Sequence, residues 1–163
     1  MVAIAGWALR PAARTVLVTC LFVSTAYIGW TWVGKSIVER DARIALAEGG
    51  LEYRAMFSVP TPLNSLLWRA VVMDESGYYE GYYSVLDDDN AIAFSHYPSD
   101  NSLLAGLEQD WNTQRLQWFS KGFYKVSRFG DDIVLSDLRM GVEPLYFFSF
   151  AVGKLSTDGI VTQ

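Results

Sequence analysis

Few residues in this sequence have the types and spacing that metal-dependent catalysis requires. His96 is the only histidine, and the only cysteine, Cys20, lies in an apolar stretch. A catalytic metal usually needs several converging His, Asp or Glu ligands, each held by a further partner. The acidic run 87–90 offers oxygen ligands to calcium, but the spacing and the distant glutamate of an EF-hand are absent. We therefore expect no metal and no cofactor in this chain, a solvated turn at 87–90, and His96 at a strand end or turn.

Charged residues within apolar runs are the stronger candidates for a site. Arg69 lies in a predicted strand among apolar neighbours, and Asp137 and Arg139 follow a second such strand. Because buried charges are usually paired, we expect Asp137 to be the partner of Arg69 in an ion pair that fixes the sheet. The alternative is a cleft for an anionic group, lined by Arg69, Asp137 and Arg139, with Asn64 binding in the nearby turn. These four residues are the predicted binding site.

A third arrangement would make the chain an enzyme in its own right. Carboxylates such as Glu80, Asp137 and Glu143 can act as acid and base only where they converge, which sequence spacing alone does not show. The tyrosine-rich run 78–83 alternates its rings between the two faces of a strand. That pattern suits a stacked sugar or base, and it suits cross-strand packing equally well. We favour packing, so the catalytic residues stay unknown.

The composition limits the partners. The 163 residues are 51% hydrophobic and 15% aromatic, which is enough for one packed domain and a short appendage. The net charge is −5, and the basic residues do not form the cluster that a phosphate backbone requires. We therefore expect no nucleic-acid partner.

Residues 15–34 predict a transmembrane helix. No charged residue lies between Arg14 and Lys35, and a helix of about 20 residues is about 30 Å long, the thickness of a bilayer core. Trp30 and Trp32 lie at its carboxyl end, where aromatic rings prefer the headgroup layer. Basic residues flank both ends almost equally, so the side of the membrane that carries the folded part stays open. We expect the lipid bilayer to be a partner.

Two other interpretations of this segment are available. A cleaved secretory signal would use Arg10 and Arg14 as its basic region and residues 24–26 as its cleavage site, although the apolar run continues beyond them. A lipoprotein signal ending at Cys20 would have almost no apolar region after Arg14. Residues 1–9 are also apolar, and we expect them, with the basic loop to residue 14, to be the remnant of a preceding membrane segment.

The rest of the pattern predicts an α+β fold, in which the transmembrane helix precedes a mostly antiparallel sheet of about six strands with one packed helix. We expect the membrane helix to run on into a juxtamembrane helix over 35–50, and the packed helix to run from residue 100 to about 119, with Gly-Gly and Ser-Asp as end signals. The predicted strands are 51–59, 66–73, 78–86, 91–97, 123–128, 133–136 and 145–152. One soluble domain thus spans 51–155, followed by a tail over 156–163.

Several long motifs carry a family resemblance. They are PTPLNSLLWRAVVM (60–73), GYYEGYYS (77–84), LQWFSKGFYKV (116–126) and SDLRMGVEPLYFFSF (136–150). Together they resemble the C-terminal part of the bacterial inner-membrane proteins called membrane-bound, metal-dependent hydrolases, including the LexA-regulated member. The resemblance covers the last membrane helix and essentially all of the soluble domain, and it implies location in the inner membrane. In that family the His and Asp residues credited with metal binding lie in an N-terminal multi-helix part, so a divalent metal is implied only there.

Two functions follow as expectations. The first is the C-terminal soluble domain of an inner-membrane metal-dependent hydrolase-like protein, accessory or substrate-facing and not catalytic alone, with a membrane-embedded partner or N-terminal half. The alternative is a membrane-tethered binding or interaction module with no hydrolase role. An anion-binding cleft at Arg69, Asp137 and Arg139 would favour the first. A pocketless sheet with an exposed apolar patch would favour the second.

Overall fold

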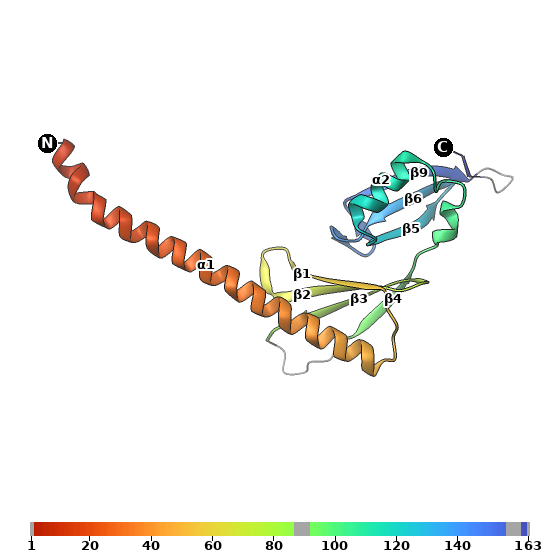
Figure 1. Cartoon of the computed structure of the whole chain (residues 1–163), viewed down its shortest axis with the longest axis horizontal. Helices are drawn as coiled ribbons and strands as arrows, with labels where there is room; N and C mark the ends of the chain where they lie inside the picture. Colours follow the sequence, from red (N-terminus) through yellow and green to blue (C-terminus); the bar gives the residue numbers. More distant parts are fainter. Residues whose placement is uncertain (1, 87–91, 156–160, 163) are drawn as a thin grey trace.

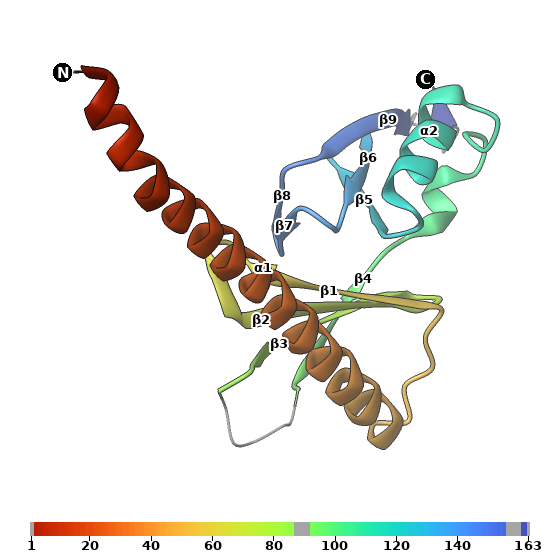
Figure 2. The same cartoon turned by 60° about the vertical axis from the view of Figure 1, so that its left-hand side comes forward.

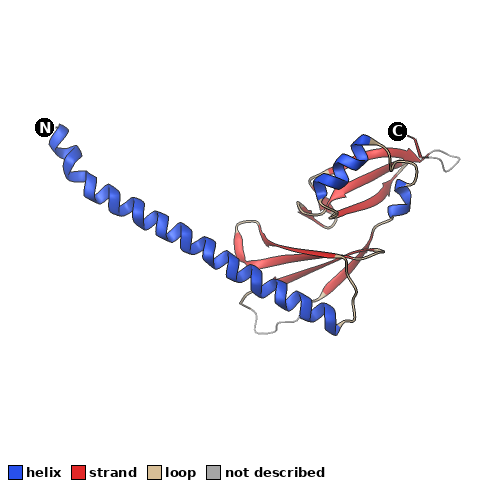
Figure 3. Ribbon diagram, in the orientation of Figure 1, coloured by secondary structure: helices blue, strands red, loops and turns tan. Residues whose placement is uncertain are grey.

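The chain begins with one uninterrupted helix. The computed structural model describes residues 2–86, 92–155 and 161–162, with side chains over 12–86 and 92–155. Helix α1 (Val2–Glu48) covers both the predicted transmembrane segment and the predicted juxtamembrane helix. It ends at the expected Gly-Gly pair, where Gly50 has a φ of 61° and the Leu51 N–H donates to the Leu46 carbonyl at 2.9 Å. Its amino-terminal half extends away from the folded part, and its carboxyl half lies along a sheet (Figures 1 and 3).

Four antiparallel strands after α1 form the first sheet, in the order β1-β2-β3-β4. Their bounds are β1 (Ala55–Thr61), β2 (Asn64–Met73), β3 (Gly77–Ser84) and β4 (Phe94–Pro98). The β1–β2 turn includes Leu63 at a φ of 60°. The β2–β3 turn is closed by Asp74, whose Oδ1 accepts hydrogen bonds from two backbone N–H groups of the turn. The resulting register places Arg69 opposite Tyr82.

One face of the first sheet packs on the carboxyl half of α1. Strand alternation directs Trp68 of β2 and Tyr83 of β3 to this face, where they meet Val38 and Ala42 of α1. The helix and sheet approach closely at Gly34, where an added Cβ would lie 3.3 Å from the Trp68 ring. The helix that leaves the folded part is therefore also part of its core.

The second half of the chain forms another four-stranded antiparallel sheet, in the order β10-β9-β6-β5. Its elements are the 3-10 helix η1 (Asn101–Leu104), α2 (Trp111–Ser120), β5 (Tyr124–Phe129), β6 (Asp132–Asp137), β9 (Ser149–Leu155) and β10 (Val161–Thr162). A short hairpin between β6 and β9 consists of β7 (Gly141–Val142) and β8 (Leu145–Tyr146). Asp110 caps α2 by accepting from the Thr113 N–H at 2.7 Å. Leu116 of α2 then packs with Val126 and Leu135 of the sheet.

The two sheets meet through the face of the first sheet that is turned away from α1. Val71, Tyr78 and Leu138 are fully buried there. Phe57 and Phe123 join them edge to face, with their ring centroids 4.7 Å apart. Figures 1 and 2 show the two sheets as separate layers, with α1 against the first.

The α+β class, the antiparallel strands and the long apolar N-terminal helix are confirmed. In the described residues the strands number ten, and they form two four-stranded sheets and a hairpin instead of one sheet of about six. The predicted helix from residue 100 to 119 divides into η1 and α2, because Gly106 between them has a φ of 89°. The predicted strand 145–152 likewise divides into β8 and β9. The acidic run 87–90 and most of the expected tail lie outside the described residues.

Candidate functional site

A buried ion pair lies where the two sheets meet. Arg69 of β2 and Glu80 of β3 are 2% and 6% exposed, and Nη2 of Arg69 lies 2.6 Å from Oε2 of Glu80. The register places Tyr82 opposite Arg69, so Glu80 is the diagonal neighbour on the same face. Nη1 of Arg69 donates to the backbone carbonyl of Leu138 at 2.8 Å, while its Nε has no partner in the described part of the chain. The guanidinium group thus ties one sheet to the other.

Hydroxyl groups extend this pair into a continuous polar network. The Tyr146 hydroxyl lies 3.4 Å from each member of the ion pair and 2.9 Å from the Tyr78 hydroxyl. Tyr78 donates to Oε2 of Glu143 at 2.5 Å, and Nζ of Lys125 donates to Oε1 of Glu143 at 2.9 Å. The Tyr82 hydroxyl donates to Oε1 of Glu80, the second carboxylate oxygen of the ion pair, at 2.8 Å. We call this set the polar junction: Arg69, Tyr78, Glu80, Tyr82, Lys125, Glu143 and Tyr146.

The charges in the polar junction are offset by their neighbours. Burial lowers the pKa of Arg69, but the hydrogen bond and the negative charge of Glu80 outweigh burial and raise it overall. Burial raises the pKa of Glu143, but the hydrogen bonds from its tyrosine and lysine neighbours outweigh burial and hold that pKa below its usual value. Burial is also the main cause that raises the pKa values of Tyr78 and Tyr146. At neutral pH Glu143 is therefore ionised, and both tyrosines keep their protons.

This arrangement suits a structural clamp better than it suits catalysis. A general base needs a free lone pair and a pKa near the working pH, whereas both oxygens of Glu143 accept hydrogen bonds and its pKa is lowered. Glu80 and Glu143 do converge through two tyrosines, as an enzyme acting alone would require, but a cation neutralises each of them. Asp137 is paired with Arg139 instead.

The predicted pairing of Arg69 with Asp137 is wrong. Glu80 is the partner of Arg69, because the β2–β3 register brings it to the guanidinium group. Asp137 binds Arg139, with Nη2 to Oδ2 at 2.6 Å and Nε to Oδ1 at 3.0 Å. Asn64 is exposed at the start of β2, where its Oδ1 accepts a backbone N–H two residues further on at 2.9 Å. The structure thus brings Arg69 next to the segment that holds Asp137 and Arg139, but each of these charges bonds within the protein, and Asn64 serves its own turn.

His96 lies in the middle of β4, opposite Tyr79, and not at a strand end or turn as predicted. Its Nε2 is 3.1 Å from Oγ of Ser76 and 3.4 Å from Oδ2 of Asp74, and its ring tilts against that of Tyr79 with 4.7 Å between centroids. Among the residues that the structure describes, no group of three or more His, Cys, Asp or Glu side chains could hold a metal ion. The contacts of His96 belong to the β2–β3 turn and to cross-strand packing.

Sequence patterns do not single out the large exposed surface beside the second sheet. Its apolar side chains come from the end of α2, from the β7–β8 hairpin with its flanks, and from β9. We call them the aromatic face: Trp118, Phe119, Met140, Val142, Leu145, Phe147 and Phe150. The signals that the sequence offers are the double aromatic of α2 and the LYFFSF run at 145–150. These patterns predict an amphipathic helix and a strand, which are usually buried on one side.

Ring contacts join part of the aromatic face. The ring of Phe148 lies 6.4 Å from that of Phe119 and 6.5 Å from that of Phe150, between centroids. The Phe147 N–H donates to the Met140 carbonyl at 3.1 Å. Two guanidinium groups lie over its rings, Arg115 over Trp118 at 4.9 Å and Arg139 over Phe119 at 5.0 Å. Exposed large apolar side chains that are gathered on neighbouring elements favour a site of interaction.

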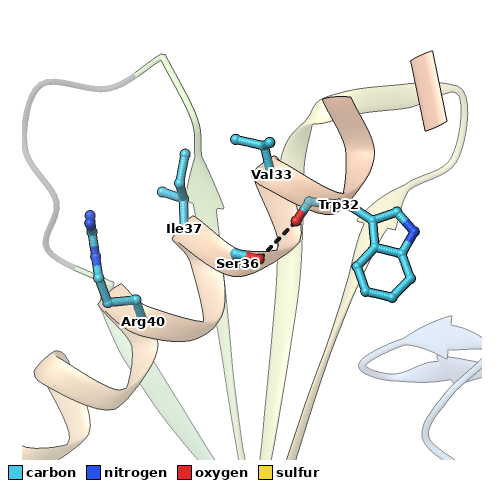
Figure 4. Close-up of a pocket in the computed structure, with 5 residues that line it drawn as sticks. All are labelled: Trp32, Val33, Ser36, Ile37 and Arg40. Carbon is cyan, nitrogen blue, oxygen red and sulfur yellow. Dashed lines mark hydrogen bonds between the residues drawn. The ribbon is translucent and has the colours of Figure 1, made fainter. Parts of the chain in front are cut away.

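The point where α1 reaches the first sheet has a cluster of its own. Figure 4 shows a shallow hollow of about 370 Å³, lined by Trp32, Val33, Ser36, Ile37 and Arg40. The Trp32 ring points away from the other side chains in that view (Figure 4). One residue further on, Asp41 is buried and accepts hydrogen bonds from Arg40 at 2.7 Å and from the Tyr83 hydroxyl at 2.9 Å. The bond from Arg40, helped by that from Tyr83, lowers the pKa of Asp41 against the effect of burial.

Before this point α1 is apolar and uncovered. In the described residues one stretch, Ala12–Glu48, has the length and composition of a helix that can cross a membrane, and its most apolar window is not buried in the protein. Leu21 and Phe22 are typical members, at 68% and 73% exposure. A membrane span and a signal sequence share these properties. Either way, exposed apolar surface on this scale needs a partner other than water.

Comparison with known proteins does not identify the chain. No protein-family model, no curated protein and no solved structure matches it. The motif similarity to membrane-bound hydrolases therefore supports a proposal and no more.

Tyr82 gives the polar junction a measurable response to alkaline pH. Burial, followed by the hydrogen bond to Glu80, raises the pKa of Tyr82 from 10.0 to about 12. The unfolded chain loses this phenolic proton first, so the contribution of Tyr82 to stability is complete below pH 10.0 and is lost as the pH rises to about 12. We expect stability to fall over this range, and to fall less steeply in Tyr82→Phe, as measured by urea unfolding at a series of pH values. Equal slopes for the two proteins would contradict this role.

Proposed function

We propose that this chain is a membrane-tethered interaction module without catalysis of its own. In this proposal residues 15–34 of α1 cross a bilayer, and the two sheets are held as one body at its surface. The anchor supplies location, and the folded part supplies the surface that binds.

The observation that carries this proposal is the continuity of α1. One helix passes from fully apolar, exposed positions such as Leu21 to Val38, Ala42 and Leu46, which are 0% exposed in contact with the folded part. A flexible linker would let the domain sample many heights and orientations above a membrane. A helix that is also core does not, because rotating the domain away from it would expose the packed side chains and the Asp41 carboxylate.

The polar junction supports the second half of the proposal. Its hydrogen bonds and ion pairs link β2 and β3 of the first sheet to Leu138, Glu143 and Tyr146. These three residues belong to the half of the chain that carries the second sheet, which we call the second unit. Hydrogen-bonded polar networks rigidify a structure, since breaking their bonds would leave buried groups unpaired. Of the charged groups considered as catalytic or anion-binding, Arg69, Glu80 and Glu143 therefore help to hold the two sheets together, while Asp137 and Arg139 bind each other.

The resemblance to membrane-bound, metal-dependent hydrolases specifies one kind of partner. In that version, the chain is the accessory or substrate-facing domain of an inner-membrane hydrolase-like system, and the metal with its ligands belongs to a membrane-embedded partner or N-terminal half. A photoreactive amino acid at Ile28, which is exposed on α1, tests this version in native membranes. Capture of a multi-helix protein with His and Asp motifs is the expected result. Capture of lipid alone, or of this chain alone, would count against the hydrolase version and leave the tethered module in place.

The tethering itself is tested by extraction and mass. Membranes that contain the full chain are washed with alkaline carbonate, and the protein that stays in the pellet is measured by intact mass spectrometry. The proposal predicts an uncut chain in the pellet, because a spanning helix resists alkaline washing. A shortened protein that begins near residue 27 and leaves with the wash would show that the apolar segment is a cleaved signal.

A further inference from the structure

The aromatic face is largely exposed in the described part of the chain, although it is built from side chains that proteins usually bury. Phe147 and Leu145 are 81% and 76% exposed, and Trp118 is 68% exposed. Covering such side chains yields about 1.5–3 kcal/mol each, so the bare surface favours association. The question is what covers it.

The position of the aromatic face relative to α1 bears on this question. In Figure 2 the β7–β8 hairpin lies at the end of the second unit that faces α1. The tip of the β1–β2 hairpin lies beside α1 in both views (Figures 1 and 2). Leu63, at that tip, is fully exposed. The β7–β8 hairpin, which carries part of the aromatic face, and the apolar β1–β2 tip thus both lie on the side of the molecule that faces α1.

We infer that the aromatic face rests in the headgroup layer of the membrane that α1 crosses. This inference depends on the proposed anchoring of α1. The rings of Trp118, Phe119 and Phe147 then enter the boundary between headgroups and acyl chains, and the β1–β2 tip enters beside them. The module is held by a spanning helix and by a second, interfacial contact.

The chemistry of the face fits a lipid interface better than a protein groove. Aromatic rings concentrate at the headgroup level because each offers an apolar body to the acyl chains and a quadrupole or polar edge to the headgroups. Arg115 is exposed and lies over the Trp118 ring, where its stem can stay with apolar atoms and its guanidinium group can reach phosphate oxygens. Trp30 and Trp32 on α1 have the same chemistry near the predicted end of the membrane segment.

Tethering also favours this occupant. A surface fixed beside the bilayer by a rigid helix meets lipid at very high effective concentration, whereas a soluble protein has to arrive from solution. Contacts that would be too weak to bind the free domain to a membrane are then enough to keep the aromatic face of the tethered domain on the lipid surface.

The test uses the full chain in vesicles of three parts phosphatidylcholine to one part phosphatidylglycerol, with a nitroxide-labelled lipid as quencher. Three proteins carry one fluorescent label each: the natural chain at Cys20, and Phe147→Cys and Phe129→Cys, both with Cys20→Ser. Phe129 is the matched control, because it is 80% exposed but lies at the β5–β6 turn, at the other end of the second sheet. We expect strong quenching at position 20, and at position 147 quenching at least about threefold stronger than at 129, since nitroxides act only on groups in contact with lipid.

Each outcome decides a separate point. Quenching at position 20 with equally weak quenching at 147 and 129 would overturn the seated aromatic face and leave the anchor intact. Weak lipid quenching at 147 together with protection from aqueous iodide would also overturn it, because a second copy or another protein would then cover the face. Weak quenching at position 20 would overturn both the anchor and the inference that rests on it.

Discussion

Replacing Glu80 with alanine should lower the free energy of unfolding by about 3–5 kcal/mol, the usual cost of removing one partner of a buried ion pair. Arg69 is 2% exposed and keeps its charge, because a guanidinium group cannot lose its proton inside a protein. Its Nε already lacks a partner in the described chain. Without Glu80, the guanidinium group would keep only the Leu138 carbonyl and the Tyr146 hydroxyl as acceptors. The loss of Glu80 also removes the acceptor of Tyr82. Urea unfolding of the detergent-solubilised protein, followed by circular dichroism, measures the change.

Two further variants distinguish the loss of the ion pair from a nonspecific effect of substitution on stability. The double variant Arg69→Met, Glu80→Leu removes both charges and should regain most of the lost stability, since apolar replacements of a buried pair are often neutral or better. Glu75→Ala is the matched single change, because Glu75 is exposed in the β2–β3 turn, and it should shift stability by less than about 0.5 kcal/mol. If Glu80→Ala were as mild as Glu75→Ala, the polar junction would not be the clamp between the sheets.

The second large effect is expected in the apolar half of α1. The double variant Leu21→Arg, Ile28→Arg places two charges near the middle of the predicted span, at about 2.5–3.5 kcal/mol each in the insertion free energy. Arginine is a good helix former, so the helix itself should persist. We therefore expect most of the protein to leave the alkaline-resistant membrane pellet, as measured by quantitative immunoblotting of pellet and wash.

Phe129→Arg serves as the control for adding a charge at an exposed apolar position. Phe129 is 80% exposed, and Leu21 and Ile28 are 68% and 57% exposed, so all three positions are accessible. Phe129 differs because it lies on the second unit. This variant should stay in the pellet like the natural protein. If the double variant also stayed in the pellet, lipid would not be what covers α1, and a protein partner would have to be considered.

The sequence predicts α1 well from residue 15 onward, because a charge-free apolar run long enough to span a bilayer is typical of a helix. It also predicts that the membrane helix runs on into the juxtamembrane helix, but the basic loop expected before residue 15 is part of the helix instead. Gly34 and Lys35 look like a boundary in composition, yet neither breaks a helix that continues on both sides. The division of the strands into two sheets could not be predicted from the sequence, since alternation tells which residues share a face and not which strands share a sheet.

The candidate site divides in the same way. The burial of Arg69 follows from its apolar neighbours, but its partner depends on the β2–β3 register. Given a hairpin turn at 74–77, the alternation of Tyr78, Glu80 and Tyr82 on one face would have favoured Glu80 over a carboxylate in a distant strand. The hydrogen bonds from Tyr78 to Glu143 and Tyr146 could not be foreseen, because they join parts of the chain more than sixty residues apart.

The central claim is that lipid surrounds residues 15–34 while the folded part stays in water, and the single cysteine tests it directly. Cys20 is exposed on α1, so the folded part does not shield it from reagents. In open membrane fragments, where both sides are accessible, a membrane-impermeant maleimide should leave Cys20 unlabelled until the membrane is dissolved in a denaturing detergent. The variant Glu75→Cys in a Cys20→Ser background should label at once. Labelling of Cys20 at the rate of this control, before any detergent is added, would contradict the claim.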